Sequence, residues 1–239
     1  MTQKSNEKQL AISVENVGVA YLRRAGFLRK EKFWALKDVS FDVFHGETLG
    51  IIGRNGVGKS TLLRLLAGII FPDRGEIINH GVNASLLSLQ VGFIGHLTGR
   101  ENAILSGMML GLSKSEMIDR MDEIRSYTDI GDFFDQPVRG YSSGMRARLG
   151  FSVTTYANPD VILLDEVLGV GDADFRKKSA LTMREKIKSN KTVVLVSHQK
   201  SLIMDVCDRV VWIDDGYIQA AGDAPEVMNN YTNNLTEGN

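Results

Sequence analysis

The chain has 239 residues, of which 43% are hydrophobic, and its 28 Lys and Arg side chains nearly cancel its 29 Asp and Glu side chains. This length and composition fit a folded soluble chain with one α/β domain and an inserted lobe, or with two small domains. A net charge of -1 argues against a protein that coats a nucleic-acid backbone, because such a role would need a local basic patch.

Cysteine usage and the lack of long apolar runs indicate the cellular compartment in which the chain works. Cys207 is the single cysteine, so no internal disulfide can form, which suits a reducing cytoplasm. We expect Cys207 to be a small, buried, apolar side chain. The first ten residues lack the apolar core of a signal peptide, and no run approaches the roughly 18 apolar residues of a membrane span. We therefore expect any work at a membrane to depend on docking to a partner.

The first predicted elements are two strands with interleaved polar residues, at residues 10–21 and 36–44. Residues 22–33 between them are rich in Arg and Lys; a solvated loop is the first interpretation, and a surface facing anionic lipid or substrate is the sharper one. A strand at residues 47–53, a glycine loop and a helix over residues 61–69 follow, and residues 71–76 predict a turn.

From Thr98 to about Gly140 the pattern is helical. Thr98 with Glu101, and Ser113 with Glu116, each satisfy the capping box, so two helix starts are predicted. Apolar strands at residues 160–166 and 191–198 then alternate with helices, and a hairpin is expected around residues 215–216. This alternation indicates a parallel sheet buried on both faces, so the helical stretch is expected to be an insertion into an α/β core.

The glycine loop reads GRNGVGKS at residues 53–60 and matches the phosphate-loop pattern G-x-x-x-x-G-K-[ST] between a strand and a helix. Glycines let backbone N–H groups wrap a phosphate, and the helix N-terminus adds its positive dipole end. We expect Lys59 to reach the β- and γ-phosphate oxygens and Ser60 to ligate Mg²⁺. The predicted nucleotide contacts are Gly53, Asn55, Gly56, Gly58, Lys59, Ser60 and Thr61.

Two carboxylates and a histidine follow apolar strands. Because such sheets bind ligands at the C-terminal ends of their strands, we expect Asp165 to hold Mg²⁺ through its water shell and Glu166 to deprotonate the attacking water. His198 follows the strand at residues 192–197 and is expected to hydrogen-bond the γ-phosphate. The alternative is that Asp165 and Glu166 are ordinary surface acids, but this leaves their coincidence with the phosphate loop unexplained. A surface or structural role suits the other histidines, His45, His80 and His96.

The stretch YSSGMRARLGFS, residues 141–152, is a second candidate for phosphate binding. Two hydroxyls and a glycine stand ahead of a basic amphipathic run, and such residues before a helix can hold a phosphate. The order of all these motifs, with VGDAD at residues 170–174, resembles the ATP-binding subunit of an ABC transporter over nearly the whole chain.

The resemblance implies an α/β fold: a P-loop NTPase core with a mainly parallel sheet, an N-terminal antiparallel β subdomain, and an α-helical subdomain inserted at about residues 98–150 of the RecA-like core. It also implies that residues 1–239 form a single ABC ATP-binding domain, an ABC-type ATPase that uses ATP and Mg²⁺. In this family a Leu-Ser-Gly-Gly-Gln signature motif grips the γ-phosphate of the ATP held by the other subunit. Residues 141–145 take its place: Ser142 and Gly144 match, and Tyr141, Ser143 and Met145 depart from it.

Because the helical subdomain carries the signature motif away from the phosphate loop of its own sheet, the resemblance implies a head-to-tail homodimer with two composite ATP sites. Asp172 would lie at the dimer seam. An aromatic residue stacks on adenine in this family; Tyr21 is our choice, with Phe33 and Trp34 as alternatives. Gln90 stands closest to the family's glutamine loop, which senses Mg²⁺ and touches the membrane partner, but it is one position off, and a plain loop glutamine is the alternative.

The stretches at residues 85–102, 141–152 and 165–175 are similar to the subgroup that exports O-antigen, capsule and teichoic acid from bacteria. This implies a peripheral homodimer on the cytoplasmic face of the inner membrane, docked on two transmembrane permease subunits, with a lipid-linked glycan as cargo and no nucleic acid. The chain stops at Asn239, so no C-terminal carbohydrate-binding domain is expected. A groove around residues 93–112, with Met108 and Met109, is expected to receive the permease helices; ordinary core is the alternative.

Two other functions compete with polysaccharide export. The ATPase subunit of an importer, or of a drug or lipid exporter, would share every catalytic residue and differ in its membrane partner. A soluble ABC-type ATPase of translation or DNA repair is less favoured, because those proteins carry two ATPase units in one chain or a long coiled coil, and this chain has neither.

Overall fold

The computed structural model describes residues 9–24, 30–87, 92–156, 158–165, 172–189 and 191–237. Two predicted site residues, Gln90 and Glu166, lie outside these ranges. The chain divides into two compact units. The first takes the described residues within 1–86, 160–166 and 190–239, and the second takes those within 87–159 and 167–189.

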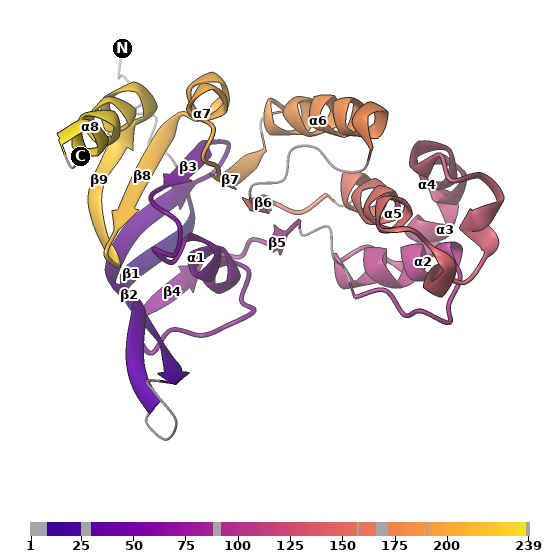
Figure 1. Ribbon diagram of the computed structural model, residues 1–239, viewed down its shortest axis with the longest axis horizontal. Coiled ribbons are helices and arrows are strands. Elements are labelled where there is room, and N and C mark those ends of the chain that lie inside the picture. Colours follow the sequence, from indigo (N-terminus) through magenta and orange to yellow (C-terminus); the bar gives the residue numbers. More distant parts are fainter. Residues whose placement is uncertain are drawn as a thin grey trace, which may run out of the picture. The chain divides into compact units, whose positions relative to one another are not determined.

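The first unit is a mixed sheet flanked by helices (Figure 1). Within the described residues the sheet has nine strands in the order β4-β1-β2-β9-β8-β3-β7-β6-β5. The strands are β1 (Leu10–Arg24), β2 (Lys30–Phe44), β3 (Thr48–Ile52), β4 (Arg74–Asn79), β5 (Ala84–Leu86), β6 (Val161–Asp165), β7 (Thr192–Val196), β8 (Arg209–Asp214) and β9 (Tyr217–Asp223). The helices are α1 (Lys59–Leu66), α7 (Lys200–Val206) and α8 (Ala224–Glu237).

The parallel part of the sheet determines where the candidate site lies. β3 pairs in parallel with β7 and β8, and β6 pairs in parallel with β5 and β7. Every residue of β3 and β7 is buried, which confirms the sheet buried on both faces that the apolar runs predicted. The carboxyl ends of β3, β6 and β7 share one edge, since Val196 stands opposite both Ile51 and Asp165.

The antiparallel part joins at β2, which pairs with β1 along its length and with β9 at Asp38 and Tyr217. The prediction of a loop over residues 22–33 is wrong at both ends, because β1 runs to Arg24 and β2 begins at Lys30. Tyr21 stands opposite Phe33, and the Arg23 guanidinium lies 5.8 Å from the centre of the Phe33 ring. These cross-strand contacts stabilise the paired ends of β1 and β2 in a stretch whose charge pattern suggested a loop.

The second unit is helical, with α2 (Gly99–Met109), α3 (Lys114–Asp119), α4 (Met121–Thr128), α5 (Ser143–Tyr156), α6 (Ala173–Ile187) and the short 3₁₀ turns η1 (Gly131–Asp135) and η2 (Val138–Gly140). Both predicted capping boxes are confirmed: Thr98 caps α2 with Glu101, and Ser113 caps α3 with Glu116. The hairpin predicted at residues 215–216 is confirmed as the turn between β8 and β9.

Each unit has its own apolar core. That of the first unit gathers strand residues and the buried side of α1; that of the second centres on fully buried side chains such as Ile124, Phe134 and Leu149. Burial, with Asp208 close by, raises the pKa of the Cys207 thiol to about 12, so it stays protonated at neutral pH. Among the described residues no helix has the length and apolar character needed to cross a bilayer.

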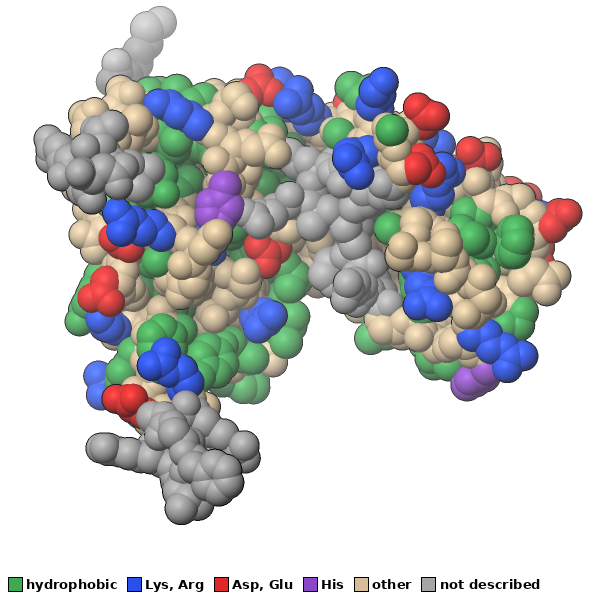
Figure 2. All heavy atoms as spheres, in the orientation of Figure 1, with side chains coloured by type: hydrophobic (Ala, Val, Ile, Leu, Met, Phe, Trp, Pro, Cys, Tyr) green, Lys and Arg blue, Asp and Glu red, His purple; other side chains and the backbone are tan. Residues whose placement is uncertain are grey.

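On the face drawn in Figure 2, basic and acidic side chains are interspersed.

Candidate nucleotide site

The phosphate loop lies between β3 and α1 in a conformation that depends on its glycines. Gly53 has φ 150° and Gly58 has φ 101°, and a Cβ on Gly58 would lie 2.6 Å from the Ala35 carbonyl oxygen. The positive φ of Gly58 and the close approach of the Ala35 carbonyl both exclude a larger residue at position 58. Lys59, at the first turn of α1, is buried and donates from Nζ to the carbonyl oxygens of Gly53 and Arg54, each at 2.8 Å. These bonds hold the ammonium group inside the curve of the loop.

The loop opens on a hollow of about 310 Å³ that brings together predicted site residues from distant parts of the sequence. Asp165 ends β6 and His198 follows β7, so the shared sheet edge places both beside the loop. The lining residues are Tyr21, Phe33, Ala35, Asn55, Gly56, Gly58, Lys59, Ser60, Thr61, Asp165, Val196 and His198. A buried cation, hydroxyls and the start of a helix suit a phosphate chain.

The same hollow fits the oxygen ligands that Mg²⁺ prefers. Ser60 contributes a hydroxyl and Asp165 a carboxylate, which are hard oxygen donors of the kind that bind Mg²⁺ together with phosphate oxygens and water. Gln90, the third predicted ligand, lies outside the described residues, as does Glu166, the predicted base.

Two of the three candidate adenine partners line this hollow. Tyr21 and Phe33 stand opposite each other on β1 and β2 and are 41% and 46% exposed. The Tyr21 hydroxyl lies 3.3 Å from the Thr61 hydroxyl on α1, which ties the tyrosine to the phosphate loop. Trp34 is not among these lining residues, and its ring contacts two cations, with Lys32 Nζ 4.5 Å and the Arg74 guanidinium 4.2 Å from its centre. Half-exposed rings beside a phosphate site are suited to stack on a base.

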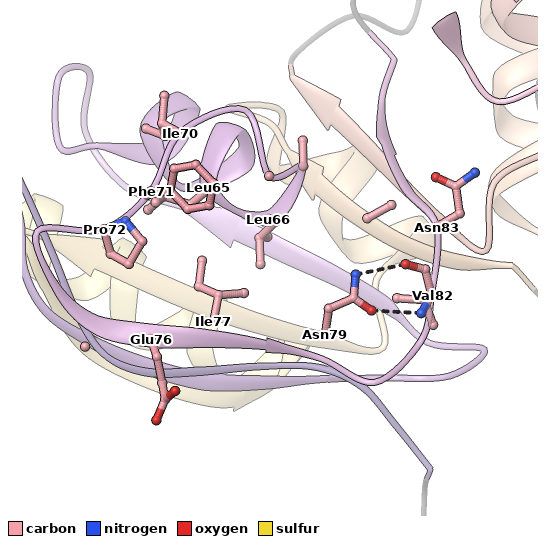
Figure 3. Close-up of a pocket in the computed structure, with 14 residues that line it drawn as sticks. Leu65, Leu66, Ile70, Phe71, Pro72, Glu76, Ile77, Asn79, Val82 and Asn83 are labelled. Atoms are coloured by element: carbon pink, nitrogen blue, oxygen red, sulfur yellow. Dashed lines mark hydrogen bonds between the residues drawn. The ribbon is translucent and has the colours of Figure 1, made fainter. Parts of the chain in front are cut away.

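A larger hollow of about 500 Å³ in the first unit holds none of the predicted site residues (Figure 3). Apolar side chains such as Leu66, Phe71 and Ile77 surround it, and the Asn79 side chain bonds to the backbone of Val82 at its rim. Its lining contains no Lys or Arg, so it is poorly suited to a polyphosphate.

The second unit gathers the signature motif around another hollow of about 330 Å³. Ser142 precedes α5, where its hydroxyl accepts a hydrogen bond from the Met145 N–H at 3.1 Å, while Ser142 and Ser143 are both exposed. The lining residues are Asp129, Ile130, Phe133, Ser142, Gly144, Met145, Arg148 and Asp172. The buried Tyr141 donates its hydroxyl to the Phe133 carbonyl at 2.5 Å, and burial raises its pKa to about 12.

Sequence reasoning overlooked Arg148, Asp129 and Phe133 in this second hollow. Arg148 lies one helical turn after Gly144, and the i, i+4 spacing on α5 was the signal that could have found it. Asp129 and Phe133 come from a different part of the chain, and no sequence spacing indicates their placement.

The stretch at residues 93–112 divides between core and surface. Ala103 is fully buried, and Phe93, Ile104, Leu110 and Leu112 pack against the core of the second unit. Met108 and Met109, at the end of α2, are 46% and 70% exposed.

His80 has a structural partner, with Nε2 lying 3.2 Å from the Ser13 hydroxyl.

Comparisons with known proteins agree on one family. The family described as ABC transporter matches residues 36–169. The chain is 46% identical over 204 residues, 85% of its own length and 83% of the relative's, to the O-antigen export system ATP-binding protein RfbB of Klebsiella pneumoniae. It is 44% identical over 203 residues to the teichoic acids export ATP-binding protein TagH of Listeria innocua, which covers 85% of this chain but only 60% of that relative.

Solved structures give the fold. The structure of an ATP-binding subunit of an ABC transporter matches with a TM-score of 0.72 at 22% identity, covering 93% of each chain. A dimeric ATP-binding cassette bound to ADP and Pi matches with a TM-score of 0.70 at 22% identity, covering 89% of this chain and 98% of that one.

Proposed function

This chain belongs to the ABC transporter family of ATP-binding domains, and on that premise we propose that it powers export of a lipid-linked polysaccharide across the bacterial inner membrane. Similarity along most of the chain to O-antigen and teichoic acid export proteins is the observation that carries this proposal. The whole chain acts as one ATP-binding domain with an inserted helical subdomain. It lies peripherally on the cytoplasmic face, docked on two permease subunits.

The hollow beside the phosphate loop holds the nucleotide in this proposal. Backbone N–H groups of the loop wrap the phosphates, Lys59 neutralises the β- and γ-oxygens, and His198 hydrogen-bonds the γ-phosphate. Ser60 and Asp165 hold Mg²⁺, which neutralises charge on the phosphate oxygens when it is bound; Gln90 is its third candidate contact. Glu166, the residue after Asp165, removes a proton from the attacking water.

The signature motif completes the site of a second copy. Ser142, Ser143 and Gly144 stand exposed or half-buried at the start of α5, where hydroxyls and backbone N–H groups are available to a phosphate. Two chains arranged head to tail then share two ATP molecules, with Asp172 at the seam. ATP joins the chains and hydrolysis releases them, so the dimer is a switch between two states that differ in phosphate contacts.

Tyr21 stacks on adenine in this proposal, because its ring is held to α1 through Thr61. Tyr21→Leu is expected to weaken ATP binding about tenfold, since a base loses roughly 1–3 kcal/mol when its aromatic partner is removed. Trp34→Leu is the matched control and should leave ATP affinity unchanged, because Trp34 is not among the residues that line the hollow beside the phosphate loop and its ring contacts Lys32 and Arg74. Titration of each purified variant with a fluorescent ATP analogue measures this, and the opposite ranking would assign adenine to Trp34.

Deletion of the gene tests the transport function. We expect one surface polysaccharide to disappear and its lipid-linked form to accumulate inside the cell, because synthesis continues while export stops. The parent gene should restore the surface glycan, and a Lys59→Ala gene should not. An unchanged surface with a new defect in uptake or in drug resistance would instead indicate another class of ABC transporter.

A further inference from the structure

One arginine joins three helices of the second unit. Arg148, on α5, is 15% exposed, and its Nη2 donates to Oδ2 of Asp172, before α6, at 2.5 Å. Its Nη1 donates to the backbone carbonyl of Asp129 at 3.2 Å and to the Asp129 carboxylate at 3.4 Å, at the end of α4. The guanidinium therefore connects the helix of the signature motif to the end of α4 and to the start of α6.

Asp172 is held from two sides. Its Oδ1 accepts a hydrogen bond from the Phe175 N–H at 3.1 Å and so caps α6, while its Oδ2 accepts from Arg148. The Arg148 guanidinium, helped by the Phe175 N–H, holds the pKa of the Asp172 carboxyl below its ordinary value. Asp172 therefore stays ionised at neutral pH, and the pair with Arg148 persists there.

An aromatic cluster keeps the same three helices together. Tyr127 on α4, Phe151 on α5 and Phe175 on α6 contact one another, with ring centres 5.8 to 6.1 Å apart. Arg148 lies over Phe175, with 4.9 Å between the guanidinium and the ring centre. Because apolar contacts already hold the helices, and because the Asp172 side chain is 58% exposed, the ion pair adds little to folding stability.

The Arg148–Asp172 pair contributes little to folding but connects the helix that begins after Ser142 to Asp172, which suggests a role in positioning. We propose that Arg148 is a positioning residue that makes Ser142 and Asp172 move together when the signature motif engages the partner copy's ATP. α5 is one continuous helix from Ser143 to Tyr156, so a shift at its start displaces Arg148 and, with it, Asp172. This inference rests on the proposed composite site.

The test uses ATP-induced dimers of the Glu166→Gln chain, measured by sedimentation. Adding Arg148→Met removes the guanidinium but keeps an unbranched stem over Phe175; we expect the dimer dissociation constant to rise about tenfold. ATP affinity of the monomer should not change, because the phosphate loop belongs to the first unit. Asp172→Asn, which keeps a capping oxygen, should have the same effect. The double variant should be no worse than either single one, because both act through one contact.

Arg100→Met is the matched control. Arg100 pairs with Asp135 at 2.7 Å and lies 5.4 Å from the centre of the Phe134 ring, so it is a similar pair in the same unit that joins α2 to η1 and not α5 to α6. It should lower the melting temperature by as much as Arg148→Met without weakening the dimer. The inference is overturned if Arg148→Met and Asp172→Asn dimerise like Glu166→Gln alone. If Glu166→Gln alone does not dimerise with ATP, that result contradicts the proposed composite site itself.

Discussion

Replacing Glu166 with glutamine is expected to reduce ATP turnover by roughly 10²–10⁴-fold while leaving ATP binding intact, because the amide cannot accept the proton of the attacking water. Asp165, the residue before it, ends β6 in the hollow with Ser60 and Lys59. The residues proposed to hold the phosphates are thus different from the proposed proton acceptor. With hydrolysis blocked, ATP should keep the two copies joined, so the variant should accumulate as a stable dimer.

Phosphate release under saturating ATP, together with sedimentation in the presence and absence of ATP, measures both effects. Asp160→Asn is a suitable control, because Asp160 lies at the opposite end of β6, where its carboxylate accepts from the Asn83 N–H. This control should retain turnover. A Glu166→Gln chain that hydrolyses ATP like its parent would show that another group is the base.

Lys59→Ala and Ser142→Asp are each expected to abolish ATP turnover when the preparation contains that variant alone, for different reasons. The first removes the buried ammonium group from the phosphate loop. The second keeps an oxygen that can accept from the Met145 N–H, so α5 remains capped, but it places a carboxylate where the partner's phosphate would lie. Two like charges about 4 Å apart repel by about 4 kcal/mol at an effective dielectric constant near 20, roughly a thousandfold in affinity.

The sequence predicted most of the fold because its signals are local. Capping boxes at Thr98 and Ser113 marked helix starts, and buried runs such as VILLD marked strands of a parallel sheet. The meeting of the phosphate loop, Asp165 and His198 in one hollow also followed from a local rule, since all three lie at carboxyl ends of strands in one parallel sheet.

Features set by contacts between distant segments were not predictable. The extension of β1 to Arg24 and the start of β2 at Lys30 depend on pairs such as Tyr21 with Phe33, which no charge pattern indicates. The partners of Arg148 come from the end of α4 and the start of α6. Likewise, the sequence favours Tyr21 as the adenine partner with Phe33 and Trp34 as alternatives, and it takes the fold to show that Tyr21 and Phe33 line the hollow beside the phosphate loop.

Mixing the two inactive variants tests the composite site most directly. In a dimer of one Lys59→Ala chain and one Ser142→Asp chain, one ATP site carries both defects, while the other has an intact phosphate loop and an intact signature motif. Random pairing of equal amounts would make about a quarter of all sites intact. We predict that ATP turnover returns on mixing, in proportion to the mixed dimers. If the mixture stays as inactive as its components while the parent is active, the phosphate loop and the signature motif do not act between two copies of this chain.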